Sequence, residues 1–339
     1  MKRIGFLSFG HYQAVPGSVV RTAADALLQT VELAVAAEEV GADGAFVRVH
    51  HFAPQLASPF PLLAAIGART SRIEIGTGVI DMRYENPLYM AESAAAADLI
   101  SGERLQLGVS RGSPETALAG YESFGYVPGE GESDADMARR HTAIFLAAIA
   151  GEAMANADPR MTGTSGGLSI QPLSPTLPER IWWGAGTRAT AEWTAEQGMN
   201  LMSSTLLTED TGEAFDKLQA EQIQRFRDTW AEMGWEREPR VSVSRSIIPI
   251  VDDESRRYFG ARAQVEGRDQ VGHLDGGIAR FGRSYIGEPE KLVAELAQDE
   301  AVRMADTVLV TVPNQLGVDF NARLLEAVVG VGRELGWRD

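Results

Sequence analysis

Residues 72–112 read RIEIGTGVIDMRYENPLYMAESAAAADLISGERLQLGVSRG, and the architecture can be followed outward from them. Two short apolar runs, Arg72–Ile80 and Arg104–Ser110, have the length and composition of buried strands. Between them, Pro87–Ile100 has a longer helical pattern that begins with proline, whose missing N–H costs nothing at the start of a helix. The stretch therefore predicts a strand, a helix and a second strand in that order.

The same alternation of strands and helices extends from this unit toward both ends of the chain. We expect further strands at Ile4–Phe9, Ala45–Val49, Arg180–Gly184, Met199–Ser204, Val241–Val251 and Thr307–Val312. We expect further helices at Thr22–Val40, Pro61–Thr70, Met137–Ala150, Thr187–Gln197, Glu213–Met233, Pro289–Ala297 and Phe320–Leu335. Eight such β–α units without a break in composition predict a single α/β domain over residues 1–339, a (β/α)8 or TIM barrel. A doubly wound open sheet is the competing fold.

The chain is longer than the ~250 residues that such a barrel needs, so we expect insertions between the units. One candidate is 151–171, which is rich in Gly, Ala and Thr. The other is 252–288, which is polar with several glycines and some aromatic residues. Because this second segment is far longer than a usual barrel loop, it is a candidate lid over a bound ligand. A folded insertion that never moves is the alternative.

The composition disfavours several classes of protein. The chain has 31 Lys and Arg residues and 47 Asp and Glu residues, and the net charge of −16 disfavours binding to nucleic acid or to anionic membranes. It has no cysteine, which removes disulfides and thiolate metal sites and fits a reducing compartment. We recognise no signal peptide and no apolar stretch of the ~18 residues that a membrane span needs. We therefore expect a cytoplasmic protein.

In a barrel of this kind the active site forms after the C-terminal ends of the strands. Three of the five histidines, His11, His50 and His51, fall at such ends, where a histidine can move a proton near neutral pH. For each of them, a histidine that only hydrogen-bonds a loop is the alternative. Since His50 and His51 are neighbours on a strand and point to opposite faces, we expect no metal site.

Two further strand ends carry groups that suit a phosphate. Arg111 follows the fourth strand beside Gly112, and a guanidinium next to bare backbone can bind a phosphate. Thr187, Arg188 and Thr190 begin a helix, where free N–H groups and hydroxyls attract anions. A surface salt bridge for Arg111 and an ordinary N-cap for Thr187 are the alternatives. The two strand ends together make one shared phosphate plausible.

The two Gly-x-Gly turns, Gly76–Gly78 and Gly184–Gly186, do not open a dinucleotide fingerprint, because both lack its third glycine. We therefore expect no Rossmann-type nicotinamide site. The glycines of the first turn could let a flat ring lie against the strand, or they could be packing points in the barrel wall. Both interpretations stay open.

With these residues in place, the chain resembles the bacterial luciferase-like, flavin-dependent monooxygenase family over nearly its whole length. The resemblance lies in the order and spacing of five segments: 49–52 (VHHF), 73–92 (IEIGTGVIDMRYENPLYMAE), 98–112 (DLISGERLQLGVSRG), 181–198 (IWWGAGTRATAEWTAEQG) and 285–292 (YIGEPEKL). The first and third segments look most like the luciferase branch, which uses FMN.

The resemblance implies reduced FMN in the mouth of the barrel. By that resemblance, His50 would assist the chemistry of flavin and substrate. Arg111 would bind the flavin phosphate, helped by the hydroxyls of Thr187 and Thr190. The strand at Gly78–Val79 would press on the flavin ring, and in the family it often carries a non-proline cis peptide.

Ser110, Gly186 and Arg188 complete the set of residues expected to contact the cofactor. Luciferase itself has a cysteine where Ser110 stands and a glutamate where Gly186 stands, and its branch commonly has an acid where Val49 stands. These departures argue against light emission and long-chain aldehyde substrates, and they leave the flavin site intact.

The resemblance implies a monooxygenase that uses reduced FMN and O₂ to oxidise a small organic substrate, such as an aldehyde, through a flavin peroxide. A separate flavin reductase would supply the reduced FMN. A deazaflavin-dependent oxidoreductase on the same barrel, or a non-catalytic flavin-binding or partner subunit, are the alternatives. The family dimerises through helices after the early strands, and Pro87–Ile100 is rich in alanine, so we expect a homodimer.

Overall fold

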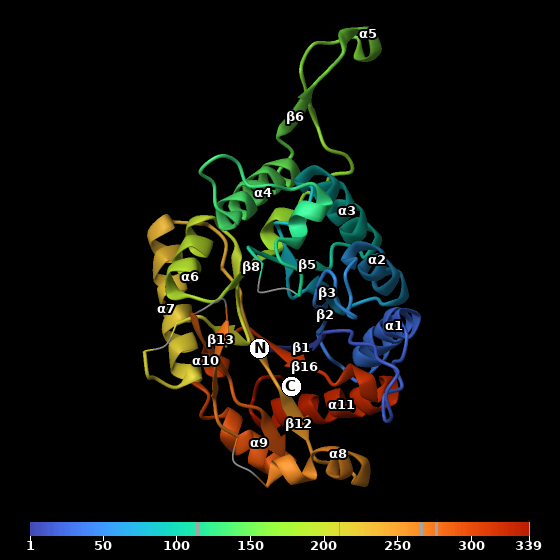
Figure 1. Cartoon of the computed structure of the whole chain (residues 1–339), viewed down its shortest axis with the longest axis vertical. Coiled ribbons are helices and arrows are strands. Elements are labelled where there is room, and N and C mark those ends of the chain that lie inside the picture. Colours follow the sequence, from blue (N-terminus) through green and yellow to red (C-terminus); the bar gives the residue numbers. More distant parts are fainter. Residues whose placement is uncertain (113–115, 210, 265–266, 275–276, 339) are drawn as a thin grey trace.

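The centre of the molecule is a closed ring of parallel strands with helices packed around its outside (Figure 1). The computed structural model describes residues 1–112, 116–209, 211–264, 267–274 and 277–338. In ring order the eight strands are β1 (Arg3–Ser8), β2 (Gly44–Val47), β3 (Glu74–Thr77), β5 (Leu105–Ser110), β8 (Ile181–Ala185), β9 (Asn200–Ser203), β11 (Val241–Arg245) and β16 (Thr307–Thr311). β3 pairs with β5 and β16 pairs with β1, so the sheet closes. The predicted (β/α)8 barrel is confirmed, and the open sheet is wrong because it would leave two unpaired edges.

The helices follow the strands as the periodicity predicts, apart from a short helix at Glu300–Met304 that the pattern did not indicate. They are α1 (Ala23–Glu39), α2 (Pro59–Arg69), α3 (Pro87–Ile100), α4 (Asp134–Ile149), α6 (Arg188–Glu196), α7 (Phe215–Met233), α9 (Pro289–Leu296), α10 (Glu300–Met304) and α11 (Val318–Glu334), with short 3₁₀ turns at Gly120–Phe124, Leu177–Arg180 and Asn314–Leu316. α3 has the predicted bounds because the Asn86 side chain caps its first turn and Pro87 is its first residue. Within the described residues, no helix combines the length and apolar character needed to cross a bilayer.

Side chains fill the barrel interior between its two ends. An apolar cluster inside the ring contains Leu7, Phe46, Trp182, Met202 and Leu309. Toward the N-terminal ends of the strands, the Arg240 guanidinium contacts both Glu74 carboxylate oxygens at 2.9 and 3.0 Å and lies 5.0 Å from the ring of Trp182. The barrel interior is therefore packed below its C-terminal opening, which is the end that carries active sites in this fold.

The first insertion is a hairpin that projects from the body beyond α4 (Figure 1). It consists of β6 (Ala153–Asn156), α5 (Pro159–Thr162) and β7 (Gly167–Ser169), and β6 pairs with β7. It falls within the predicted insertion 151–171.

The second insertion, 252–288, is a folded addition with its own secondary structure. It contains α8 (Asp253–Ala263), β13 (Gln270–Leu274), β14 (Gly277–Phe281) and β15 (Tyr285–Gly287). β14 also pairs with β10 (Leu206–Leu207), a short strand that follows β9. The predicted continuous strand Val241–Val251 is wrong, because β11 ends at Arg245 and the separate β12 (Ile247–Pro249) leaves the barrel to pair with β15.

One arginine ties three early elements of the barrel together. Arg104, which precedes β5, donates to the carbonyls of Gly67 and Thr70 at 2.8 and 2.9 Å. It also donates to the carbonyls of Ile73 and Ser101, both at 2.6 Å. The guanidinium therefore joins the ends of α2 and α3 to the start of β3, where backbone acceptors would otherwise lack partners.

We predict that Arg104→Ala lowers the free energy of unfolding by about 3 kcal/mol, because several carbonyls lose a charged donor. Chemical denaturation monitored by circular dichroism measures this loss. Arg69→Ala, at an exposed position on α2, is the control and should cost less than ~0.5 kcal/mol. Equal stability of the two variants would contradict the role given to Arg104.

Candidate functional site

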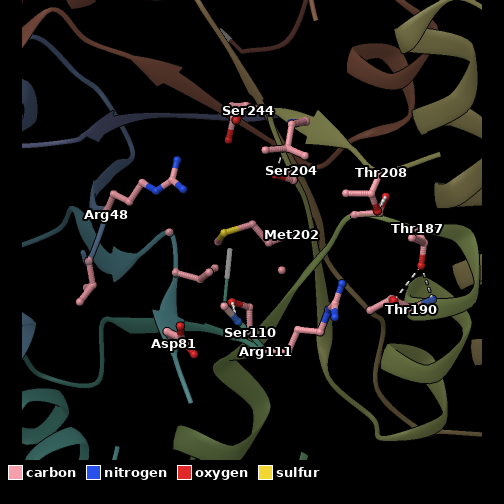
Figure 2. A pocket seen from close by; sticks show the side chains of 18 of the residues that line it. Arg48, Asp81, Ser110, Arg111, Thr187, Thr190, Met202, Ser204, Thr208 and Ser244 are labelled. Atoms are coloured by element: carbon pink, nitrogen blue, oxygen red, sulfur yellow. Dashed lines mark hydrogen bonds between the residues drawn. The ribbon is translucent and has the colours of Figure 1, made fainter. Parts of the chain in front are cut away.

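A cavity of about 410 Å³ opens at the C-terminal ends of the barrel strands (Figure 2). Its described lining comprises Leu7, Arg48, Val49, Gly78, Val79, Asp81, Arg83, Ser110, Arg111, Gly112, Asp134, Gly184, Gly186, Thr187, Thr190, Met202, Ser204, Thr205, Leu206, Thr208 and Ser244. These residues come from β1, β2, the bend at Gly78–Val79 after β3, β5, β8, β9 and β11, and from the segments that follow those strands. The cavity has the size of a small-molecule site and lies at the barrel end that carries active sites.

The structure brings most of the predicted cofactor residues together in this cavity. Gly78, Val79, Ser110, Arg111, Gly186, Thr187 and Thr190 all line it. His50 and Arg188 are not among the described lining residues. Both residues lie at the predicted strand ends, but their side chains lie outside the described lining of the cavity.

The bend after β3, together with β4 (Ile80–Asp81) and β8, forms one wall of the cavity, in which glycines let neighbouring groups come close to the backbone. The peptide bond between Gly78 and Val79 is cis, as the family resemblance implies. A Cβ at Gly184 would lie 3.2 and 3.3 Å from the Val79 methyl groups, so a larger residue there would press on this bend. Of the two interpretations of the Gly76–Gly78 turn, packing in the barrel wall holds for Gly76, and contact with a flat ring stays a prediction for Gly78. Gly76 is a packing point, where a Cβ would lie 2.3 Å from the carbonyl oxygen of Gln106, whereas Gly78 lines the cavity.

The opposite side of the cavity carries hydroxyl groups and the start of a helix. Thr187 is the N-cap of α6, and its Oγ1 accepts a hydrogen bond from the Thr190 N–H at 3.1 Å. The two hydroxyls are 2.8 Å apart, so one of them donates to the other and the other keeps a free proton for a ligand (Figure 2). Helix N-termini with such donors bind anions.

The arginines around this cavity differ in whether a carboxylate already holds them. Arg83 contacts Asp81 and Asp134, each at 2.7 Å, and these carboxylates raise its pKa against the opposing effect of burial. Arg188 contacts Glu209 at 3.3 Å and Glu221 at 2.9 Å. Both guanidinium groups are therefore neutralised within the protein.

Arg111 has no such partner. Within the described part of the chain its guanidinium makes no ion pair and no hydrogen bond, and it extends toward the side of the cavity that carries Thr187 and Thr190 (Figure 2). Gly112, directly after it, has φ +90° and would place a Cβ 2.1 Å from the Asp81 carboxylate, so only glycine fits. The alternative of a surface salt bridge for Arg111 finds no support among the described residues.

Basic and aromatic groups gather where β1 and β2 end. His11 stacks on Phe9 with ring centroids 5.7 Å apart, and the Arg48 guanidinium lies 4.9 Å from the same ring. Burial, and then the neighbouring His50 and Arg48, lower the pKa of His11, which favours its neutral imidazole at pH 7. His50 is therefore close enough to this group to act on it electrostatically, although it does not line the cavity.

His51 occupies a different environment from His50. Its ring stacks on Tyr84 at 4.2 Å and meets the edge of Phe124 at 5.1 Å. It is a buried member of an aromatic cluster. Because β2 ends at Val47, both histidines lie beyond the strand, and the alternation of strand neighbours does not apply to them. Among the described residues, no group of three or more His, Asp or Glu side chains is placed to hold a metal ion.

Sequence reasoning missed several lining residues. Arg48 lies one residue before the predicted strand end, and reading only the residues after each strand passed over it. Ser244 was missed because the strand from Val241 was predicted to run on to Val251, which placed its end too late. Met202 and Thr208 are long-range partners that only the folded barrel brings to the cavity.

A family model described as luciferase-like monooxygenase matches residues 1–309. The chain belongs to the luciferase-like monooxygenase family. The family includes FMN-dependent monooxygenases and F420-dependent oxidoreductases, and its members are flavin- or deazaflavin-dependent oxidoreductases.

Curated relatives in this family match only part of their own length. The uncharacterized protein YwcH of Bacillus subtilis (strain 168) is 37% identical over 98 residues, 28% of this chain and 29% of that protein. The F420-dependent glucose-6-phosphate dehydrogenase of Mycolicibacterium gilvum (strain PYR-GCK) is 39% identical over 102 residues, 28% of this chain and 30% of that enzyme.

Solved structures of luciferase-like monooxygenases and related enzymes share the fold over nearly the whole chain. Monooxygenase RslO1 from Streptomyces bottropensis has a TM-score of 0.71 at 18% identity, covering 97% of this chain and 98% of that one. The oxygenating constituent of 3,6-diketocamphane monooxygenase from Pseudomonas putida, in complex with FMN, has a TM-score of 0.68 at 16% identity, covering 97% of each chain. An F420-dependent secondary alcohol dehydrogenase has a TM-score of 0.63 at 15% identity, covering 100% and 99%. At these identities the likeness shows the fold alone.

One carboxyl group close to Asp81 of the cavity lining has a pKa that links stability to pH. Burial, and then the charge of Asp81, raise the pKa of Glu85 from 4.5 to about 7. The unfolded chain releases this proton near pH 4.5, whereas the folded protein keeps it until about pH 7. The contribution to stability therefore falls as pH rises through this window and stays low above it.

We predict that Glu85→Gln raises the free energy of unfolding at pH 8 by on the order of 1–3 kcal/mol, and by less at pH 5.5. The amide removes the charge that the folded environment disfavours. Denaturant titrations at the two pH values measure the difference, with Glu92→Gln, at an exposed position on α3, as the control. An equal gain at both pH values would show that Glu85 does not titrate in this window.

Proposed function

We propose that the protein is a monooxygenase that uses reduced FMN and O₂ to oxidise a small organic substrate. The observation that carries this proposal is Arg111, which has no ion pair within the described residues and faces the hydroxyls of Thr187 and Thr190 across a cavity with an apolar wall. A cation and two hydroxyls at a helix N-terminus match a phosphate, and the apolar wall suits a flat ring. The donor set therefore fits FMN.

The same groups favour FMN over a deazaflavin. Coenzyme F420 carries an oligoglutamate tail beyond its phosphate, and such a tail calls for several unpaired cations. Arg188, beside the phosphate end, is instead held by Glu209 and Glu221, and the chain has a net charge of −16. FMN needs only the one cation that Arg111 provides.

Within this proposal the chain's own groups bind the cofactor, exclude water and move a proton. Bound reduced FMN would supply the electrons that activate O₂. Leu7, Val79 and Met202 would keep water from the reacting face. His50 would hold or transfer a proton at its imidazole, with the neutral His11 nearby as its electrostatic neighbour. The segment 252–288 would close over the opening, since its β14 pairs with β10, whose Leu206 lines the cavity.

The proposal includes two protein partners. A separate flavin reductase would deliver the reduced FMN. A second copy of the chain would pack against α3, which exposes Tyr89 (72%), Leu99 (44%) and Ile100 (55%) on its outer surface. Exposed apolar side chains on one helix suit a homodimer contact.

Turnover with defined cofactors tests the proposed function. The purified protein is supplied with FMN, NADH and a flavin reductase, or with reduced F420, and oxidation of a panel of aldehydes and other small organic compounds is followed. Oxygen consumption coupled to an oxidised product with FMN supports the proposal. Activity only with F420 would make the protein a deazaflavin oxidoreductase. FMN binding without any product would leave a non-catalytic flavin-binding or partner subunit.

We predict that Arg111→Ala weakens FMN binding by 1.5–3 kcal/mol, roughly 10- to 150-fold, because a charge-assisted bond to the phosphate is lost. Fluorescence titration measures the dissociation constant, and the melting temperature should be unchanged. Arg160→Ala, on the projecting hairpin with a side chain 88% exposed, is the matched control. An unchanged FMN dissociation constant in Arg111→Ala would remove the phosphate from this end of the cavity.

We predict that His50→Ala keeps fold and FMN affinity but lowers product formation about 10²-fold, the usual contribution of a general acid or base. H₂O₂ release should persist, because O₂ still reacts with the flavin. Product and H₂O₂ are measured together in one assay, with His51→Phe as a neighbouring variant that preserves ring packing. Equal product yield in His50→Ala would reduce His50 to a structural residue.

A further inference from the structure

We propose that Gln222, on α7, is a positioning residue that orients the loop of the cavity on which the phosphate of the cofactor would lie. The inference rests on the proposed flavin site. The loop runs from Gly184 to Thr187 between β8 and α6, and α7 packs behind it.

Gln222 holds the loop from the buried side. Its side chain is 1% exposed, and its Nε2 donates to the carbonyl of Ala185 at 3.3 Å and to the carbonyl of Thr187 at 3.0 Å. The Ser203 hydroxyl, at the end of β9, donates to its Oε1. One amide therefore joins the ends of two neighbouring barrel strands to α7.

These bonds help to decide which way the loop's peptide groups face. The Ser204 N–H also donates to the Ala185 carbonyl at 3.4 Å, and the Ala191 N–H also donates to the Thr187 carbonyl at 3.1 Å. In a trans peptide plane the C=O and N–H groups point in opposite directions. Because Gln222 draws the Ala185 and Thr187 carbonyls toward α7, the N–H groups of Gly186 and Arg188 point away from it. The loop then presents N–H groups, not carbonyl oxygens, on the side away from α7, where a phosphate needs donors.

An anion of the chain itself already uses this arrangement. The Glu209 carboxylate accepts a hydrogen bond from the Arg188 N–H at 2.9 Å, in the same peptide plane whose carbonyl Gln222 holds. The face opposite Gln222 therefore binds a negative group in this structure, independently of any cofactor.

The choice of glutamine at a buried position on α7 also needs a reason. A buried amide costs free energy unless its hydrogen bonds are made, and the buried neighbours Leu218, Ile223 and Phe226 are apolar. Gln219, one turn earlier, makes the corresponding bonds at the end of β9, donating to the Ser203 hydroxyl at 2.9 Å and the Ser204 carbonyl at 2.7 Å. An apolar side chain at 222 would fill the space but remove one of the two donors that hold each of the Ala185 and Thr187 carbonyls.

The test compares FMN with riboflavin, which has the same ring and lacks the phosphate. Dissociation constants for both are measured by fluorescence titration on the wild-type protein, Gln222→Met and Gln224→Met, with melting temperatures alongside. Gln224 is exposed on the same helix and serves as the matched control. We expect Gln222→Met to weaken FMN about tenfold through two lost hydrogen bonds, and to change riboflavin affinity less than ~2-fold. Gln224→Met should change neither.

The outcomes distinguish a failure of the positioning role of Gln222 from a failure of the proposed flavin site. A wild-type preference for FMN over riboflavin that survives in Gln222→Met, or an equal loss for both ligands, would overturn the positioning role alone. A wild-type protein without that preference would overturn the phosphate site and the inference together. If Gln222→Met does not fold, Gln222→Asn carries the same test, because it keeps an uncharged amide but is one methylene shorter, so its donor no longer reaches both carbonyls. It should lose the FMN preference as well.

Discussion

Closure of the parallel strands is the constraint on which the rest of the molecule depends. Because β3 pairs with β5 and β16 pairs with β1, every strand delivers the residues that follow it to the same opening. Residues as far apart as Leu7 and Ser244 meet in one cavity for this reason alone. Toward the other end, the Arg240–Glu74 ion pair lies over Trp182 inside the packed barrel, which separates the cavity from that end.

Within that opening, charge is distributed unevenly between the two ends of the cavity. In a chain with an excess of carboxylates, most cations near the cavity are already paired, as Arg83 is with Asp81 and Arg188 is with Glu209. A cation without a carboxylate partner therefore indicates where an anionic ligand can bind, and Arg111 is such a cation within the described residues. The helix start at Thr187 adds donors of the same polarity on the facing side. Gln222 on α7, together with the N–H groups of Ser204 and Ala191, holds the carbonyls of the loop before that helix.

Much of the fold followed from the sequence because it depends on local periodicity and on capping. α3 begins and ends where Asn86, Pro87 and its C-terminal turn dictate, and the eight-strand count came from the same local patterns. The insertion at 252–288 could not be resolved in this way, since β14 is completed by pairing with β10, more than sixty residues earlier. The strand that begins at Val241 was misread because Ile247–Pro249 has strand character but pairs outside the barrel.

The same distinction applies to the candidate site. Arg111, Thr187 and Thr190 were found because their position after a strand is a local property, and the cavity brings them together. Arg188 stands in the same motif, yet its guanidinium is held by Glu221 from α7, a long-range contact that no motif reports. The role of Gln222 could not be predicted from the sequence. A glutamine within an amphipathic helix is common, and only the structure shows which carbonyls it binds.

A crystal structure of the protein with bound FMN tests the central claim most directly. The account predicts the phosphate within about 3 Å of the Arg111 guanidinium and of the Thr187 or Thr190 hydroxyl, with the ring against the Gly78–Val79 bend. A phosphate bound elsewhere on the barrel, or a ring outside this cavity, would contradict it.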